Sequence, residues 1–181
     1  MTPRALVTGA AGGIGHATVE AFVEHGWQVV GVDRREASVM PQGAEFWRSD
    51  LSEPNAVQEL VERLQEKGDK LDALVNNAAI QLAKPICETT LEEWDAVHQV
   101  NLRAIFSLSK SALPLLLAAR GAIVNVSSVH ALATSVNAAA YASSKGALLA
   151  LTRAMALEFG SGGVRVNAVL PGTVDTQMLR A

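Results

Sequence analysis

The chain has 181 residues, of which 49% are hydrophobic and 18% are charged, and its formal net charge is −3. The length suits a single domain over residues 1–181, and the low charge content indicates that much of the chain is buried, in a core or against other subunits. No basic face is needed to account for this composition, so nucleic acid is not expected as the main partner.

Apolar runs alternate with helical patterns along the chain. Near-continuous apolar strands separated by helices predict a parallel sheet covered on both faces, which is a doubly wound, Rossmann-type α/β fold. The first half is predicted to hold strands at 4–9, 28–33 and 44–50, with helices at 13–26 and 55–68. The second half is predicted to hold strands at 71–79, 121–128 and 164–172, a helix at 138–159, and a region 90–119 that is helical in two pieces.

The first strand runs into the glycine-rich turn TGAAGGIG, which opens the first helix. Such glycines permit a sharp turn, a close approach of the backbone to a pyrophosphate, and tight packing of the helix on the sheet. The positive N-terminal end of the helix then faces the phosphates. A tight turn without a ligand is the alternative. The turn predicts a dinucleotide cofactor that contacts Gly9, Gly13, Ile14 and Gly15.

Two acidic residues follow the next strands. Asp33 ends the second strand 18 residues after Gly15, where a carboxylate accepts hydrogen bonds from the adenosine ribose and repels a 2′-phosphate. This favours NAD over NADP, although Arg34 and Arg35 follow directly and keep NADP open. Asp50 and Leu51 end the third strand, where an adenine ring can rest; a simple strand-end cap is the alternative for Asp50.

Six motifs follow one another along the chain: TGAAGGIG, NNAA at 76–79, VN at 100–101, SS at 127–128, YASSK at 141–145 and PGTVDT at 171–176. In this order they resemble the short-chain dehydrogenase/reductase family in its compact single-domain form. The resemblance implies an oxidoreductase that transfers hydride between a nicotinamide cofactor and a small alcohol or carbonyl substrate.

The resemblance also implies a role for each matching position. Tyr141 is the general acid/base, with Lys145 beside it. Ser128, which lies 13 residues before Tyr141, orients the substrate, and Asn101 supports a water chain to the lysine. The other implied residues are cofactor contacts: Asn77, Ala78, Pro171, Gly172, Val174 and Thr176.

Elementary chemistry supports the pairing of Tyr141 with Lys145. Residues four apart lie on one face of a helix, and a nearby cation is expected to lower the tyrosine pKa from about 10 towards neutrality. A lowered pKa suits a general acid/base near pH 7.

Taken one at a time, each residue also has a purely structural interpretation: a strand end for Ser128, a helix cap for Asn101, a surface charge for Lys145 and a core aromatic for Tyr141. Their joint spacing favours catalysis.

Other residues give weaker indications. His130, two residues after Ser128, and Gln81, just after NNAAI, are candidate substrate contacts, and loop packing is the alternative for His130. The remaining histidines have no ligand spacing, so no catalytic metal is predicted. The helical regions 101–119 and 138–159 are apolar around most of their circumference, which predicts a homodimer or homotetramer formed through them.

The chain departs from the family pattern in two places. Ala79 replaces the usual glycine, a small change that should spare cofactor binding. The chain also stops at Ala181, where the family's substrate-covering helices and last strand follow, so a fragment or a shortened member with an incomplete substrate pocket is expected. This leaves two rivals open: a catalytically impaired dinucleotide-binding sensor or scaffold, and an NADPH-dependent carbonyl reductase.

The sequence gives three indications of location. The N-terminal residues lack a secretory signal, and the apolar run 112–126 is interrupted by Pro114, Arg120 and Gly121, so no membrane span is expected. The single cysteine, Cys87, cannot form an intrachain disulfide, and we expect it to be a small buried residue rather than a nucleophile. A cytoplasmic protein is predicted.

Overall fold

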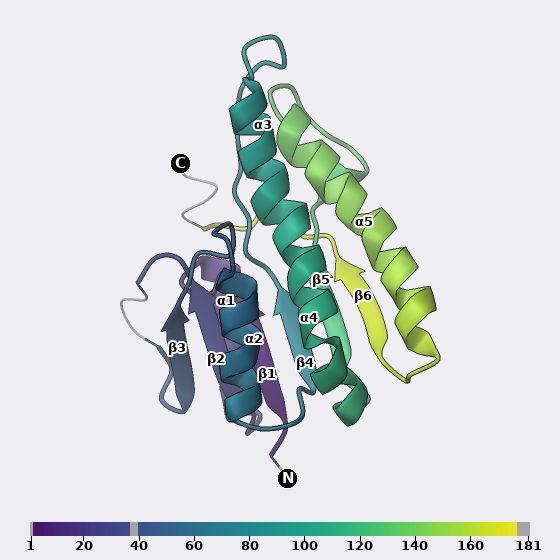
Figure 1. Ribbon diagram of the computed structural model, residues 1–181. Coiled ribbons are helices and arrows are strands. Elements are labelled where there is room, and N and C mark those ends of the chain that lie inside the picture. Colours follow the sequence, from purple (N-terminus) through teal and green to yellow (C-terminus); the bar gives the residue numbers. More distant parts are fainter. Residues whose placement is uncertain (1, 37–39, 177–181) are drawn as a thin grey trace.

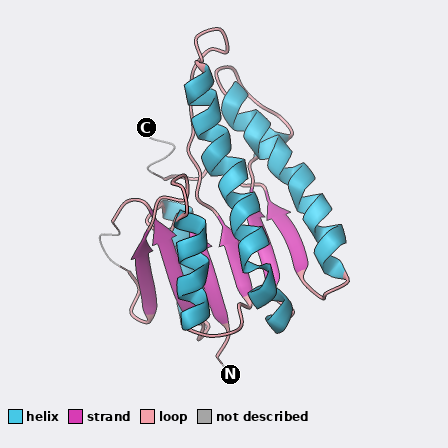
Figure 2. Ribbon diagram, viewed as in Figure 1, coloured by secondary structure: helices cyan, strands magenta, loops and turns pink. Residues whose placement is uncertain are grey.

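The structure is a computed structural model that describes residues 2–36 and 40–176. Its six strands form one parallel sheet in the order β3-β2-β1-β4-β5-β6 (Figures 1 and 2). The strands are β1 (Arg4–Thr8), β2 (Gln28–Asp33), β3 (Ala44–Arg48), β4 (Ala73–Asn76), β5 (Ala122–Val126) and β6 (Arg165–Val169). The predicted doubly wound parallel sheet is confirmed, and the strand order reverses between β1 and β4, where such sheets bind ligands.

Helices cover the two faces of the sheet unequally (Figure 1). One face carries α1 (Gly13–Glu24), which packs on Val7, Val29 and Val75. The other carries α2 (Ala56–Glu66), α4 (Ala104–Ala119) and α5 (Ala139–Gly160), which enclose the larger core. The short helices are α3 (Leu91–His98), the π-helical turn η1 (Gln99–Arg103) and the 3₁₀ turn η2 (Val129–Ala131).

The larger core explains the apolar character of the sequence. Sheet residues such as Leu6, Leu74 and Ile123 meet helix residues such as Leu108 and Leu116, and all five side chains are fully buried. Burying side chains of this size contributes roughly 1.5–3 kcal/mol each. This core fixes the helices on the sheet and therefore fixes the site at the carboxyl ends of the strands.

Some sequence predictions need correction. The region that was predicted as two helical pieces is one unbroken helical run from Leu91 to Ala119, because α3 and α4 are joined through η1. This run, Leu91–Ala119, is long and apolar enough to cross a membrane by length and composition alone, yet Ile105, Leu108 and Leu115 are buried against the rest of the fold. Cys87 is exposed rather than buried.

Strands β3, β4, β5 and β6 end earlier than the sequence predicted, by two or three residues each. The sequence predictions extended each strand into the first residues of the following loop, and these residues are polar after β3 and β5. The residues beyond these ends include Asp50, Asn77, Ser128 and Pro171. They lie outside the sheet, in the loops at its carboxyl edge.

Candidate active site

The turn after β1 has a shape that only glycine permits. Gly9 has φ +68°, and a Cβ there would lie 2.7 Å from Asn77 Nδ2 and 2.9 Å from Ala78 Cα. A Cβ on Gly15 would overlap the carbonyl oxygen of Gly9, and one on Gly13 would lie 2.6 Å from Thr176 Cγ2. The backbone is therefore packed against itself, as a phosphate-binding turn at a helix N-terminus requires.

Asn77 and Thr8 hold this turn in place. The Asn77 side-chain amide donates to the carbonyl oxygens of Thr8, at 3.0 Å, and Gly9, at 3.2 Å. The Thr8 hydroxyl oxygen accepts from the backbone N–H groups of Asn77, at 2.9 Å, and Ala78, at 3.0 Å. Thr8 is a residue that the sequence interpretation missed, although it precedes the first glycine of the motif. The structure thus joins the predicted residues Gly9, Asn77 and Ala78.

Asp33 lies beside the same turn. Its buried carboxylate accepts hydrogen bonds from the backbone N–H groups of Ala11, at 3.1 Å, and Arg35, at 2.9 Å. The Arg35 side chain approaches the same carboxylate, with Nε 3.5 Å from Oδ1. A carboxylate at the end of β2, next to glycines whose places a Cβ would fill, fits the adenosine end of a dinucleotide site.

Asp50 is occupied by its own loop. It accepts hydrogen bonds from the Ser52 backbone N–H, at 3.0 Å, and from the Ser52 hydroxyl, at 2.7 Å. Burial acts to raise the Asp50 pKa, but these hydrogen bonds and the Arg34 charge leave it lowered. This is the geometry of the strand-end cap. Leu51 packs against the larger core.

The second half of the site lies between β5 and α5. Tyr141 is 8% exposed and Lys145 only 1%. The Lys145 ammonium Nζ donates to the carbonyl oxygen of Val126 at 2.7 Å and lies 5.7 Å from the centre of the Tyr141 ring. The Ser127 hydroxyl donates to the carbonyl oxygen of Lys145 at 2.9 Å. The phenol and the amine therefore share one buried volume, as their spacing predicts.

The expected effect of Lys145 on Tyr141 is not found in this structure. Burial raises the pKa of Tyr141, and a hydrogen bond with the Ser128 side chain only partly opposes this. Burial also lowers the pKa of Lys145, to about 8. The prediction assumed a charged amine beside the phenol. The fold instead dehydrates both groups, which favours their neutral forms.

Asn101 lies inside η1 and is fully buried. Its side chain accepts from the Ile80 backbone N–H at 2.8 Å and donates to the Ile80 carbonyl oxygen at 2.9 Å and to the Ser144 hydroxyl at 3.1 Å. The helix-cap interpretation is therefore wrong. Asn101 joins the loop after β4 to α5, and Ser144 is a second residue that the sequence interpretation missed, although it stands within YASSK.

The remaining predicted residues surround this pair. The His130 ring meets the Tyr141 ring edge-on at 5.8 Å between centres, and its backbone N–H donates to the Ser128 hydroxyl at 3.2 Å. Pro171 accepts through its carbonyl oxygen from the Val129 N–H at 3.1 Å, which places its loop beside Ser128. Gln81 and Gly172 are exposed, and no hydrogen bond joins Gln81 to the other predicted residues within the described part of the chain.

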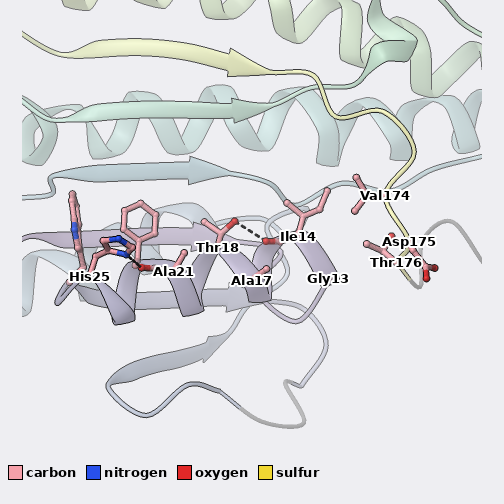
Figure 3. Close-up of a pocket in the computed structure, with 11 residues that line it drawn as sticks. Gly13, Ile14, Ala17, Thr18, Ala21, His25, Val174, Asp175 and Thr176 are labelled. Atoms are coloured by element: carbon pink, nitrogen blue, oxygen red, sulfur yellow. Dashed lines mark hydrogen bonds between the residues drawn. The ribbon is translucent and has the colours of Figure 1, made fainter.

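The loop after β6 returns to the glycine turn. Val174, Asp175 and Thr176 lie across a hollow of about 670 Å³ from the N-terminal turn of α1, where Gly13 and Ile14 line it (Figure 3). The loop after β6 therefore lies beside the start of α1, although the two segments are far apart in the sequence. The predicted contacts Val174 and Thr176 lie near the predicted phosphate contacts.

Comparison with known proteins identifies the family. The chain matches the model of the short chain dehydrogenases over residues 3–181, and it belongs to the short-chain dehydrogenase/reductase family. It is 37% identical over 180 residues to the meso-2,3-butanediol dehydrogenase of Serratia marcescens, covering 96% of this chain and 72% of that protein. It is 42% identical over 185 residues to the L-xylulose reductase of Homo sapiens, and this match covers 98% of this chain and 74% of that protein.

A solved structure gives the same result. The 3-ketoacyl-(acyl-carrier-protein) reductase from Brucella melitensis, complexed with NADH, superposes with a TM-score of 0.93 at 30% identity. The superposition covers 98% of this chain and 78% of that one. These similar proteins are dehydrogenases and reductases, so the chain is an oxidoreductase of this family that acts on CH–OH groups or the corresponding carbonyls.

Proposed function

We propose that the protein oxidises a small alcohol, or reduces the corresponding carbonyl compound, with NAD as the preferred cofactor and Tyr141 as the general acid/base. The main support is the position of Tyr141, Ser128 and Lys145 at the carboxyl ends of the strands, on the same edge of the sheet as the glycine turn. This common edge supports a hydride-transfer site formed by the glycine turn and the Tyr141 group together.

The cofactor would be held by the glycine turn and its neighbours. The backbone of Gly9, Gly13, Ile14 and Gly15 would receive the pyrophosphate, and Asp33 the adenosine ribose. The predicted adenine contacts are Asp50 and Leu51. The nicotinamide end would lie near Asn77, Ala78, Tyr141 and Lys145, under the loop with Pro171, Gly172, Val174 and Thr176. When bound, the nicotinamide supplies the acceptor or donor of hydride.

Side chains of this protein would carry out the proton transfer. In the oxidation direction, the substrate hydroxyl lies between Ser128 and Tyr141, and its proton passes to the Tyr141 phenolate. The carbon–oxygen single bond becomes a carbonyl as hydride leaves the carbon. Lys145, when charged, favours the phenolate, and Asn101 would hold the water that carries the proton outward. In the reduction direction, Tyr141 returns the proton to the carbonyl oxygen.

The substrate class is a small polar alcohol or ketone. The hydroxyl of Ser128 and the ring of His130 border the buried phenol, and Gln81 is a further candidate contact. The relatives named for meso-2,3-butanediol and L-xylulose make these two compounds the first probes.

The test uses the protein as it stands. Binding of NADH and NADPH is measured by nicotinamide fluorescence, and turnover is measured by nicotinamide absorbance with meso-2,3-butanediol and NAD⁺, and with L-xylulose and NADH. We expect NADH to bind more tightly than NADPH and at least one probe to turn over. Cofactor binding without turnover on these and a broader panel of small alcohols would instead support a dinucleotide-binding sensor.

The same helices that carry the site also offer a surface for self-association. Phe106 is 50% exposed, and it borders a groove between the α3–η1–α4 helical run and α5. The apolar part of this groove also contains Leu102, Ala147 and Leu151, beside the polar residues Asp95, His98, Gln99 and Arg103. A homodimer or homotetramer formed through α4 and α5 would cover this exposed apolar surface. The molar mass in solution, measured by light scattering, tests this. We expect the unmodified protein to have the mass of a dimer or tetramer and Phe106→Lys to have a lower mass, and equal masses for the two proteins would contradict the proposal.

A further inference from the structure

A chain of buried polar side chains lies beneath the active site. It consists of Asn76 on β4, Ser109 on α4, Asn125 on β5 and Thr152 on α5, each at most 6% exposed. The Asn76 amide donates to Asn125 Oδ1 at 2.9 Å and to Ser109 Oγ at 3.3 Å. The Asn125 amide then donates to Thr152 Oγ1 at 2.9 Å. Four elements that are distant in sequence are thereby joined in the core.

This network is costly for stability. Asn76 Oδ1 is buried and has no hydrogen-bond partner among the described residues, and an unpaired buried acceptor is unfavourable. An apolar core of the same volume would avoid that cost. The best-attested use of such buried polar groups is to select one register of packed elements over others.

The stripe of α5 that faces the core repeats every three or four residues, as one face of a helix must. On this stripe, the Lys145 ammonium donates a hydrogen bond to the carbonyl oxygen of Val126 on β5. The Thr152 hydroxyl accepts one from the side chain of Asn125, the residue that precedes Val126 on the same strand. The two attachments are seven residues apart, which is about 10.5 Å along the helix axis. The buried members of the stripe are Tyr141, Lys145, Leu148, Thr152 and Met155.

Polar attachments at separate heights restrict a helix in a way that apolar contacts do not. Near the start of α5, Asn101 also donates to the Ser144 hydroxyl and Ser127 to the Lys145 carbonyl oxygen, so the bond from Asn125 to Thr152 is the attachment in the second half of the helix. Leu148 and Met155 make non-directional contacts that tolerate small sliding movements. A hydrogen bond weakens steeply when its distance or angle changes. The Thr152 hydroxyl donates to Leu148 O at 2.7 Å, so its oxygen is oriented to accept from Asn125.

We propose that Asn125 and Thr152 are positioning residues, which fix the axial register of α5 on β5 and so hold the Tyr141 hydroxyl at Ser128. A slip of one residue would move α5 by about 1.5 Å and rotate it by about 100°. A displacement of that size at the reacting atoms costs up to roughly a hundredfold in rate. Because Tyr141 has the role given above, this assignment rests on the proposed function.

Thr152→Val tests the assignment, because it removes the hydroxyl and keeps the shape of the side chain. Ser109→Ala is the matched control, because it removes a hydroxyl from the same network on α4. We expect Thr152→Val to lower kcat roughly tenfold or more while leaving the Kd of NADH within about twofold. Thr152→Ser, which retains the hydroxyl, should restore kcat.

A second readout does not depend on turnover. Tyr141 is the single tyrosine of the chain, so the ultraviolet absorbance of phenolate reports on this residue alone. If α5 slips, the hydrogen bond from Ser128 is lost and the titration midpoint of Tyr141 rises in Thr152→Val but not in Ser109→Ala.

The outcomes separate the two proposals. An equal fall in kcat in Thr152→Val and Ser109→Ala, or equal midpoints in the two variants, would overturn the positioning role. Absence of turnover in the unmodified protein would count against the proposed function, and a midpoint raised only in Thr152→Val would still support the register of α5.

Discussion

The two halves of the site are built in different ways. The glycine turn after β1 is shaped by the backbone, and its function depends on what is absent, because a Cβ at Gly9 or Gly15 would overlap neighbouring backbone or side-chain atoms. The β5–α5 half depends on functional groups, since Tyr141 and Lys145 are buried and held by polar contacts. A change of shape should therefore damage the first half, and a change of chemistry should damage the second.

The largest expected effect is on turnover in the second half. Tyr141→Phe removes the proton-carrying hydroxyl and keeps the ring, so we expect kcat to fall roughly 10³-fold. The Kd of NADH should stay within about threefold, because the glycine turn is untouched. Stopped-flow absorbance and fluorescence titration measure both quantities. Turnover close to that of the unmodified protein would remove Tyr141 from the mechanism.

The next effect is on cofactor binding in the first half. In Gly15→Ala the new Cβ overlaps the carbonyl oxygen of Gly9 and lies 2.8 Å from Asn77 Nδ2. The turn must open, so we expect NADH to bind at least tenfold more weakly and Tm to fall. Gly160→Ala is the control, because nothing lies within 4 Å of a Cβ at that position. Equal binding in the two variants would show that the shape of the turn is not what binds NADH.

Burial of Lys145 predicts a pH dependence of stability. Its pKa is lowered from 10.5 to about 8 in the folded protein, so the unfolded chain binds more protons between these values and stability rises with pH. We expect the free energy of unfolding to increase by roughly 2–3 kcal/mol from pH 8 to pH 10 relative to Lys145→Met. Urea unfolding across this range measures the difference, and parallel curves would place the lysine in contact with solvent.

The smallest expected effect concerns cofactor choice. Asp33→Ala removes the carboxylate that accepts from Ala11 and Arg35 at the edge of the glycine turn. We expect NADH to bind roughly tenfold more weakly, because a hydrogen bond to a charged group is worth about 1.5–3 kcal/mol, and NADPH to be little affected. A larger loss for NADPH would reverse the assigned preference. Asp33→Asn, which keeps the shape, separates charge from packing.

The sequence predicted the shape of the first half of the site, but only the positions and not the ionisation of the residues in the second half. Glycine spacing reports directly on backbone shape, so the turn after β1 follows from a simple pattern, as does the place of Asp33 at the end of the second apolar run. The order of the strands in the sheet was not predicted, because it depends on contacts between segments that are distant in sequence. The i, i+4 spacing placed Tyr141 and Lys145 together. It did not predict their ionisation, because the pKa of each depends on how completely α5 and β5 exclude water.

The missed residues share one physical feature. Thr8, Ser144 and Thr152 each accept hydrogen bonds through the side-chain hydroxyl from partners that are far away in sequence, and small hydroxyl residues have no distinctive local pattern. The same reason explains Asn101, whose partners Ile80 and Ser144 are defined only when the loop after β4 meets α5. The exposed position of Cys87 was not predictable either, because one small residue in a mixed segment gives no periodicity.

The single tyrosine allows the central claim to be tested directly. We would titrate the phenolate absorbance of Tyr141 in the ligand-free protein and again with saturating NAD⁺. We predict a midpoint above 10.0 without ligand, because burial raises this pKa, and a lower midpoint with NAD⁺, because its positive nicotinamide favours the phenolate. A midpoint that NAD⁺ leaves unchanged would contradict a proton-carrying Tyr141 beside the nicotinamide.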